Sequence, residues 1–325
     1  MKAAILKSRD ATPEYGDFAE PVVDEGYELV ELVAAGIHPI VRSLAAGSHY
    51  GSTSTWPLIP GVDAVARTPL GALIYTGFVQ PPYGTLAERM AVPRTMRVAL
   101  PAGSDAVKVA AGVNPGLASW LLLSARTGEV GSLGTVLILG VTGMAGTLAV
   151  QNANVLGAAR VVGVGRNLAS LERAAKLGAE VVAITADQNG DAAAIVDALA
   201  GTAPSIVLDF LWGAPAETTF TALARRGLEE DRANIAYVQI GAMAGPEASL
   251  PASLLRSRRI RISGSGAGSA SIADVLAQIP AYVQLIANGS IQVPTQTYPL
   301  SSIGEAWSAS IESDRRIVIT VPPGK

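Results

Sequence analysis

The sequence predicts a protein of the α/β class, in which a doubly wound parallel sheet is inserted into a second, mainly β domain. Through the middle of the chain, short apolar runs alternate with helical patterns, which is typical of a parallel sheet covered by helices. In the first 115 residues, glycine and proline interrupt the pattern every few positions, as in a compact β domain with irregular loops. The length of 325 residues suggests about two domains.

The central domain, residues 116–264, is predicted to contain six strands. They are Val136–Leu139, Val161–Val164, Glu180–Ile184, Ser205–Asp209, Ile235–Ile240 and Arg259–Ser263. Helical patterns with apolar spacing near about 3.6 residues separate the first of them, at Thr147–Leu156, Leu168–Leu177 and Ala192–Leu199. The runs are apolar throughout rather than alternating, so both faces of the sheet should be covered. Six strands in this rhythm indicate a dinucleotide-binding domain.

The chain ends are predicted to share the other domain. Its expected elements are strands at Ala3–Lys7, Tyr27–Ala34 and Ala64–Thr68, a helix at Ile272–Ala287 and a last strand at Arg316–Val321. Segment 265–325, with one helix and one or two strands, is too small to bury a core of its own. We therefore expect it to return to segment 1–115.

Composition excludes several classes of function. The net charge is −3, from 24 basic and 27 acidic residues, so no basic surplus favours nucleic acid as a partner. The chain has no cysteine, which rules out disulfides, thiolate nucleophiles and cysteine-ligated zinc or iron–sulfur centres.

Neither a secretory signal nor a membrane span is expected. The apolar run after Met1 ends at Lys7, which is too short for a secretory signal. Between Glu129 and Arg160 lie 30 uncharged residues, more than the roughly 20 that span a bilayer. Glycines at 131, 134, 140, 143 and 146 interrupt that stretch, and a strand, a glycine turn and a buried helix explain it better. We expect a cytoplasmic protein without a membrane partner.

A glycine turn carries the strongest functional signal. Gly140, Gly143 and Gly146 lie between a predicted strand and a predicted helix. Glycines there allow a tight turn and let backbone N–H groups approach a pyrophosphate at the helix N-terminus. The spacing is GxxGxxG rather than GxGxxG, and a purely structural turn is the alternative. The predicted cofactor contacts in this turn are Gly140, Thr142, Gly143, Met144, Ala145 and Gly146.

The end of the second strand indicates which cofactor is bound. An acidic residue about 20 positions after the glycine turn would bind the ribose 2′-hydroxyl of NAD. This strand instead ends Gly165–Arg166–Asn167, without a carboxylate. The planar donors of Arg166 suit a 2′-phosphate, which favours NADPH over NADH. The alternative is an arginine in a solvated turn.

Motifs along nearly the whole chain resemble one family. They are Met1–Ala3, Ala34–Pro39, Pro60–Ala64, Gly84–Glu88, Gly140–Gly146, Ala149–Gln151, Ala174–Ala179 and Val207–Asp209. In this order they resemble the zinc-independent branch of the medium-chain dehydrogenase/reductases, the quinone oxidoreductase-like proteins. The resemblance implies a Rossmann domain at 116–264, inserted in a GroES-like catalytic domain at 1–115 and 265–325. It also implies an active site in the cleft between them.

Two departures from the zinc-dependent relatives argue against a metal. Those relatives have a cysteine after the residues that match Gly36 and Ile37, and a histidine before the acid that matches Asp63. This chain has His38 and Val62 there, and it lacks the four-cysteine zinc loop. His38 and His49 are its only histidines, so we expect no catalytic zinc.

Without a metal, the substrate should carry its own electron sink, as quinones and α,β-unsaturated carbonyls do. The protein would supply orientation and a donor for the developing oxyanion. The resemblance implies Tyr50 and His38 as catalytic candidates, because related enoyl-thioester reductases have a tyrosine in this loop and the family often has a substrate-side asparagine at position 38. A tyrosine that only packs and a buried hydrogen-bonded histidine are the alternatives. Asp63 is expected to orient its neighbours.

The nicotinamide half of the cofactor is expected at the remaining sites. The resemblance implies Asn114 near the carboxamide and backbone contacts at Gly241, Ala242, Gly264, Ser265 and Gly266. Together these features favour an NADPH-dependent quinone or enone reductase. The alternatives are an enoyl-thioester reductase and an NADPH-binding sensor or structural protein without turnover. The resemblance also implies a homodimer through Arg259–Ser263, although the alternating arginines could equally protect an exposed edge.

Overall fold

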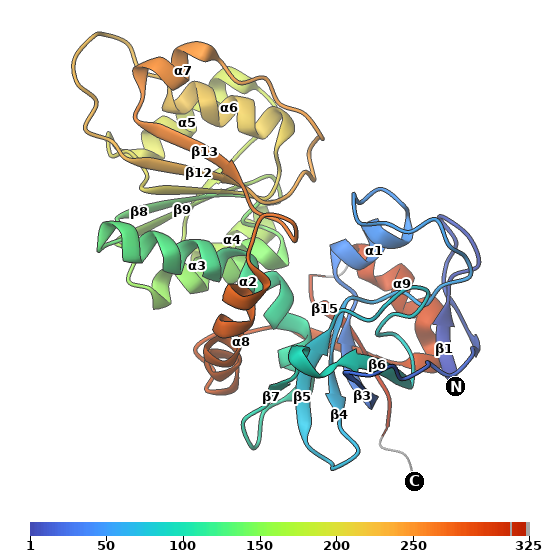
Figure 1. Cartoon of the computed structure of the whole chain (residues 1–325). Coiled ribbons are helices and arrows are strands. Elements are labelled where there is room, and N and C mark those ends of the chain that lie inside the picture. The colour runs from blue at the N-terminus through green and yellow to red at the C-terminus, as the bar shows by residue number, and fades with distance from the viewer. Residues whose placement is uncertain (313, 323–325) are drawn as a thin grey trace. The chain divides into compact units, whose positions relative to one another are not determined.

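The computed structural model describes residues 1–312 and 314–322, which form two compact units (Figure 1). Unit 1 consists of Met1–Pro115 and Leu276–Lys325, and unit 2 consists of Gly116–Val275. Unit 2 is therefore one continuous stretch of chain, whereas unit 1 is assembled from two.

Unit 2 is built on six parallel strands. They are β8 (Thr135–Leu139), β9 (Arg160–Gly165), β10 (Glu180–Ala183), β11 (Ile206–Asp209), β12 (Ile235–Gln239) and β13 (Ile260–Gly264). Their order across the sheet is β10-β9-β8-β11-β12-β13, with every pair parallel. The predicted doubly wound parallel sheet is confirmed. The strand order reverses between β8 and β11, and in such sheets ligands bind at that point, outside the carboxyl ends of the strands.

Helices cover both faces of this sheet (Figure 1). On one face lie α2 (Ala106–Val130), α3 (Met144–Val155) and α4 (Leu168–Lys176), and on the other lie α5 (Gln188–Leu199), α6 (Gly213–Leu223) and α7 (Ala252–Ser257). In β8, Val136 and Ile138 pack with the first set, while Leu137 and Leu139 pack with the second. All four are fully buried, which explains why this strand is apolar at every position.

Unit 1 contains a mixed seven-stranded sheet and a separate two-stranded one. The larger sheet runs β14 (Thr295–Pro299), β15 (Arg316–Thr320), β3 (Tyr27–Gly36), β4 (Asp63–Arg67), β5 (Leu73–Gly77) and β7 (Val98–Ala99), and β6 (Arg89–Pro93) also pairs with β3. The smaller sheet pairs β1 (Lys2–Ile5) with β2 (Glu14–Asp17). β15 runs antiparallel to β3, with Val318 opposite Gly36, so the C-terminal segment completes the N-terminal sheet.

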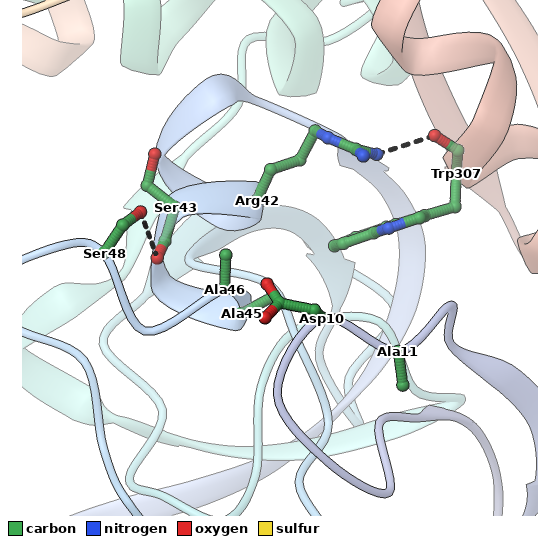
Figure 2. Close-up of a pocket in the computed structure, with 8 residues that line it drawn as sticks. All are labelled: Asp10, Ala11, Arg42, Ser43, Ala45, Ala46, Ser48 and Trp307. Carbon is green, nitrogen blue, oxygen red and sulfur yellow. Dashed lines mark hydrogen bonds between the residues drawn. The ribbon is translucent and has the colours of Figure 1, made fainter.

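Besides α2, three helices lie wholly or partly in unit 1. They are α1 (Pro39–Ala45), α8 (Ile272–Ala287) and α9 (Ile303–Glu312), and two single turns of 3₁₀ helix occur at Arg94–Met96 and Leu300–Ser302. Arg42 links α1 to α9: its Nη1 donates to the carbonyl oxygen of Trp307 at 2.7 Å (Figure 2). The same Nη1 donates to Oγ of Ser310 at 3.0 Å. Its guanidinium also lies 4.7 Å from the centroid of the Trp307 ring.

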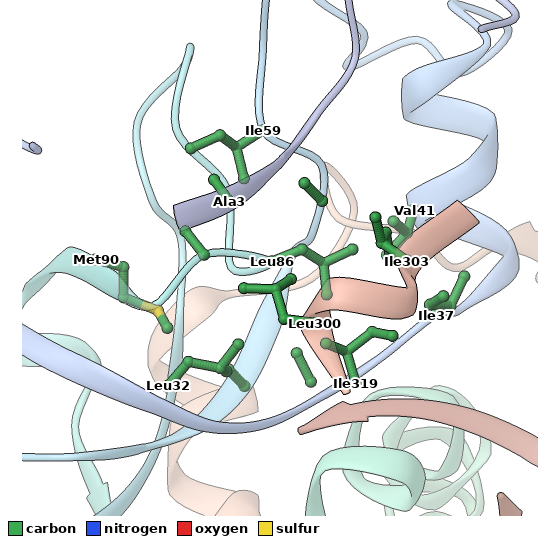
Figure 3. Close-up of a cluster of buried hydrophobic side chains, with 14 of the residues drawn as sticks. Ala3, Leu32, Ile37, Val41, Ile59, Leu86, Met90, Leu300, Ile303 and Ile319 are labelled. Carbon is green, nitrogen blue, oxygen red and sulfur yellow. The ribbon is translucent and has the colours of Figure 1, made fainter. Parts of the chain in front are cut away.

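The core of unit 1 joins segments from both ends of the chain. Figure 3 shows Ala3, Leu32 and Leu86 converging with Ile303 and Ile319 from the C-terminal segment. Each of these side chains is at most 2% exposed. Because the C-terminal residues supply part of the buried apolar surface, neither segment buries this core alone.

Five of the described helices, α1, α2, α6, α7 and α9, were not predicted from the sequence. Only one helix was expected after residue 264, which is wrong, because α9 is a second one. Its apolar positions, Ile303, Ala306 and Trp307, have helical spacing and are buried, but Gly304 and Glu305 between them and the serines after them obscure the pattern. The 25-residue α2 was not predicted either; the unit boundary at Pro115 falls inside it.

One helix of the described chain is long and apolar enough to cross a membrane by composition, and it is α2. Of its most apolar 18-residue window, 61% is buried inside the protein, as in the core helix of a folded domain. The uncharged stretch between Glu129 and Arg160 instead forms β8 and α3, as predicted.

Candidate active site

The glycine turn joins β8 directly to α3. Gly140 has φ of +86°, a conformation that favours glycine. A Cβ on Gly146 would lie 2.3 Å from the carbonyl oxygen of Gly140, so the helix packs against the turn without room for a side chain. Gly143 is the N-cap residue of α3, and no side chain caps this helix. Its first N–H groups are thus available to an anionic ligand, which is the arrangement that binds a pyrophosphate.

The loop after β11 lies next to this turn. Asp209 is fully buried, and its Oδ1 accepts hydrogen bonds from the N–H groups of Leu211 and Trp212 at 2.8 and 2.9 Å. Its Oδ2 accepts the Tyr237 hydroxyl at 2.6 Å. Burial raises the pKa of Asp209, and these hydrogen bonds oppose the rise. The Leu211 side chain lies against Gly140, where an added Cβ would be only 3.0 Å from its Cδ2.

The end of β9 brings further predicted residues to the turn. A Cβ on Gly165 would lie 2.5 Å from Cγ2 of Thr142, so these two residues are in contact. Arg166 is exposed, and within the described part of the chain its guanidinium forms neither a hydrogen bond nor an ion pair. The Asn167 side chain has a structural role: its Oδ1 caps α4 by accepting a hydrogen bond from the Ser170 N–H at 2.9 Å.

The ends of β12 and β13 complete this edge of the sheet. A Cβ on Gly241 would lie 2.7 Å from the carbonyl oxygen of Phe210, so the loops after β11 and β12 are in contact. The Ser265 N–H donates to the Gln239 carbonyl at 2.8 Å, which continues the pairing of β12 with β13 beyond Gly264. Ala242 and Gly266 are exposed beside them. The predicted residues of unit 2 thus lie at the carboxyl edge of one sheet.

In unit 1, His38 belongs to a buried polar cluster. It is the N-cap residue of α1 and is 1% exposed. Its Nε2 lies 3.5 Å from Oδ1 of Asp63, which is too poorly aligned to count as a hydrogen bond. Both ring nitrogens and this Oδ1 are buried without a hydrogen-bond partner among the described residues. The expected alternative for His38 is thus half right: the imidazole is buried, but it is not hydrogen-bonded.

Two members of this cluster were missed by sequence reasoning. The Tyr75 hydroxyl donates to Oδ2 of Asp63 at 3.0 Å, and Nη1 of Arg316 donates to the Ile37 carbonyl at 2.9 Å. Burial lowers the pKa of Arg316 to about 10, so it remains a cation at neutral pH. Burial also raises the pKa of Tyr75, with the Asp63 charge adding to the effect. The sequence offered one signal for Arg316: it is a charged residue at the first position of β15, a strand that is otherwise mostly apolar.

The remaining candidates also lie in unit 1. Tyr50 follows α1 in a loop and is 76% exposed, with its ring stacked on His49 at a centroid distance of 4.1 Å. Asn114 lies half-buried in α2, one residue before the unit boundary. Across residues 1–312 and 314–322, no three His, Asp or Glu side chains gather as a metal site would require.

Comparison with known proteins bears on the whole chain. A family model described as zinc-binding dehydrogenase matches residues 145–288, a range that contains neither cysteine nor histidine. A probable NADPH-dependent quinone reductase of Emericella nidulans is 28% identical over 98% of this chain and 99% of the relative.

Solved structures share the architecture. The quinone oxidoreductase of Thermus thermophilus, studied alone and with NADPH, is 24% identical with a TM-score of 0.78, covering 99% of this chain and 100% of that one. The quinone oxidoreductase of Pseudomonas syringae is 20% identical with a TM-score of 0.80, covering 99% and 100%.

The fold, in which a six-stranded Rossmann-type sheet is inserted between the two segments of a β-rich unit, is the fold of these oxidoreductase structures. Over nearly its whole length the chain is similar to a probable NADPH-dependent quinone reductase, and part of unit 2 matches the family model of the zinc-binding dehydrogenases. The resemblance found in the sequence is confirmed.

Proposed function

We propose that this protein is an NADPH-dependent oxidoreductase that reduces a quinone or an α,β-unsaturated carbonyl. The observation that carries the proposal is the uncapped glycine turn at the reversal of strand order, with an unpaired arginine at the end of the next strand. The Emericella relative, a probable NADPH-dependent quinone reductase, supports the proposal.

The residues of unit 2 fit this cofactor. The first N–H groups of α3 bind the pyrophosphate, and Arg166 binds the 2′-phosphate that distinguishes NADPH. Backbone at Gly241, Ala242, Gly264, Ser265 and Gly266 would hold the nicotinamide half. For unit 1 we keep Asn114 as the residue that would bind the carboxamide. When bound, NADPH supplies the hydride.

Residues of unit 1 handle the proton and the developing charge. Reduction of an enone or a quinone leaves negative charge on a substrate oxygen, which a neutral donor stabilises. We propose Tyr50 as that donor, because its hydroxyl is carried on an exposed loop. His38 is buried beside Asp63 at the start of α1, so we propose that it positions this helix and the loop with Tyr50 rather than contacting the substrate itself.

Steady-state NADPH oxidation against a panel of quinones, enones and a crotonyl thioester tests the activity. We expect turnover with quinones or enones that survives dialysis against a strong chelator. Turnover confined to the thioester would replace the proposal with an enoyl-thioester reductase. NADPH binding without any turnover would indicate a sensor or structural protein, and a zinc-restored rate would contradict the mechanism.

Tyr50→Phe tests the donor. With an enone, the variant should lower kcat by about 10²–10³ while NADPH affinity changes little, since one oxyanion donor is lost. With a quinone, solvent can protonate the product oxygens, so a much smaller loss is expected. His38→Ala, measured alongside, should lower kcat with an enone more than with a quinone, because it displaces the loop with Tyr50. If Tyr50→Phe leaves kcat unchanged with every substrate, Tyr50 is not the donor and solvent is the proton source.

A further inference from the structure

Unit 1 has a cavity of about 260 Å³ between α1 and α9, separate from the residues assigned above. Arg42, Trp307 and Asp10 line it, together with Ser48 and the methyl groups of Ala45 and Ala46 (Figure 2). None of the proposed cofactor or catalytic residues lines it. Its walls combine one aromatic ring, small apolar groups and charged groups of both signs.

Arg42 is held in this cavity with part of its donor capacity unused. Its Nη1 is satisfied by the Trp307 carbonyl and by Ser310, and the Trp307 ring lies beside the guanidinium. Of the side chains that the structure describes, none places a carboxylate within ion-pair distance, and Nε and Nη2 have no protein acceptor. Partial burial lowers the pKa of Arg42, because no anion compensates for its lost hydration.

A second cation lies at the edge of the same cavity. The Arg9 guanidinium approaches Gly47, where an added Cβ would be 2.8 Å from its Nε, and Gly47 is flanked by the lining residues Ala46 and Ser48. Asp10 supplies one carboxylate, which forms no ion pair with either arginine in the described chain. Arg9 does not line the cavity, whose charged lining residues are Arg42 and Asp10.

We propose that this cavity binds a small organic acid, with its carboxylate on the free edge of the Arg42 guanidinium. A guanidinium and a carboxylate form two parallel hydrogen bonds, and a guanidinium already fixed by its neighbours loses little freedom on binding. Asp10, the one carboxylate in the lining, repels the dianionic phosphate more strongly than a monoanion. The Trp307 ring and the alanine methyl groups suit a short hydrocarbon or aromatic body, and the volume lies below the roughly 300–1,000 Å³ of drug-sized sites.

Calorimetric titration of the full-length protein with propionate, benzoate and inorganic phosphate, at constant ionic strength, tests this proposal. We expect saturable binding of a carboxylate, weaker binding of phosphate, and about a tenfold or greater loss of affinity in Arg42→Gln, which removes a charge-assisted pair. Arg67→Gln is the matched control: it removes an equal charge from unit 1, at a residue that bonds to the Gly71 carbonyl and does not line the cavity.

Arg42→Gln also removes the link between α1 and α9, so it could weaken carboxylate binding by disturbing the fold. Asp10→Asn is a second variant that leaves this link in place. Neutralising Asp10 should strengthen carboxylate binding by about threefold to fivefold. It should strengthen phosphate binding more, and so reduce the ratio of carboxylate affinity to phosphate affinity. Binding that is unchanged in both Arg42→Gln and Asp10→Asn, or the absence of saturable binding in the wild type, would overturn the proposal. Phosphate bound more tightly than either carboxylate would overturn it as well. These titrations need no NADPH, so their outcome is independent of the proposed activity.

Discussion

Gly143 and Gly146 look equivalent in the sequence, yet the structure gives them different roles. A Cβ at position 146 would meet the Gly140 carbonyl oxygen at 2.3 Å and the Val141 Cα at 2.6 Å, both backbone atoms that cannot turn aside. At position 143 the nearest atom would be 3.7 Å away, and φ is −82°, which any residue adopts. Gly146 is therefore required by packing, whereas Gly143 is open toward the ligand side.

Alanine at each position separates these roles. Gly146→Ala should destabilise the protein by about 1–3 kcal/mol, because the helix must move away from the turn. Gly143→Ala should change the unfolding free energy by about 0.5 kcal/mol or less, while weakening dinucleotide binding. Chemical denaturation with and without NADPH measures both effects. Equal destabilisation by the two variants would contradict this assignment.

Arg166 is the residue that should select the cofactor. Arg166→Gln is expected to weaken NADPH binding by about 1–3 kcal/mol and to leave NADH binding nearly unchanged, since only the 2′-phosphate contact is lost. Titration of each cofactor by nucleotide fluorescence gives the two affinities, with Arg173→Gln on the neighbouring helix α4 as a control. An equal loss for NADPH and NADH would show that Arg166 does not contact the 2′-phosphate.

The cofactor half of the candidate site could be predicted because its signals are local. The three glycines and Arg166 follow their strands directly, and strand ends of a parallel sheet meet at one edge. The cluster around His38 could not be predicted in full: Asp63 binds Tyr75 from the next strand, and Arg316 reaches the Ile37 carbonyl across 279 residues. No local pattern encodes contacts at that separation.

The loop between β11 and α6 contains a residue in an unfavourable backbone conformation. Trp212 has φ of 55° and ψ of −160°, a region that glycine occupies readily and other residues occupy at a cost of about 1–3 kcal/mol. Its ring packs edge-on against Phe220 and Tyr237, at centroid distances of 6.0 and 6.5 Å. Aromatic packing and the two hydrogen bonds from backbone N–H groups to Asp209 thus stabilise a backbone conformation that the sequence pattern does not predict.

Asp209 should give this loop a measurable pH dependence. Burial holds its pKa above the ordinary value of 3.8. A carboxyl with a raised pKa stabilises the folded state below its unfolded pKa, and this contribution is lost as pH rises through the folded pKa. Asp209→Asn keeps the shape and removes the titration. The unfolding free energy of the wild type minus that of the variant should therefore fall as pH rises from about 4 and then level off. A difference that rises over this range would contradict the assignment.

Helices were predicted less well than strands, and the reason is physical. The strands of unit 2 are buried on both faces, so their apolar runs are continuous and conspicuous. α9 buries only Ile303, Ala306 and Trp307 on one side and exposes serines on the other, which weakens its signal. α2 was hidden because Asn114, Pro115 and Gly116 interrupt its middle, and such residues usually end helices.

At the scale of the whole molecule, unit 2 has two open sheet edges among its described strands, β10 and β13. We expect a homodimer in which two copies of β13 pair across a two-fold axis. Ser263→Lys places a charge at this edge and should yield a monomer by light scattering at micromolar concentration, because lysine on an edge blocks pairing. Val181→Lys makes the same change on β10, where valine is 39% exposed, and should leave the dimer intact. A monomeric wild type would rule out the assembly.

The pairing of β15 with β3 has a consequence for biosynthesis. Gly36 and Val318, which pair across these strands, are 282 positions apart in the sequence (318 minus 36). At translation rates of about 5–20 residues per second, the ribosome needs about 15–60 s to cover that distance. Unit 2 is continuous and can fold meanwhile, whereas the edge of β3 at Ala34–Gly36 and the core beneath it wait for their last strand. The nascent N-terminal segment is therefore the part of this protein that most needs a chaperone.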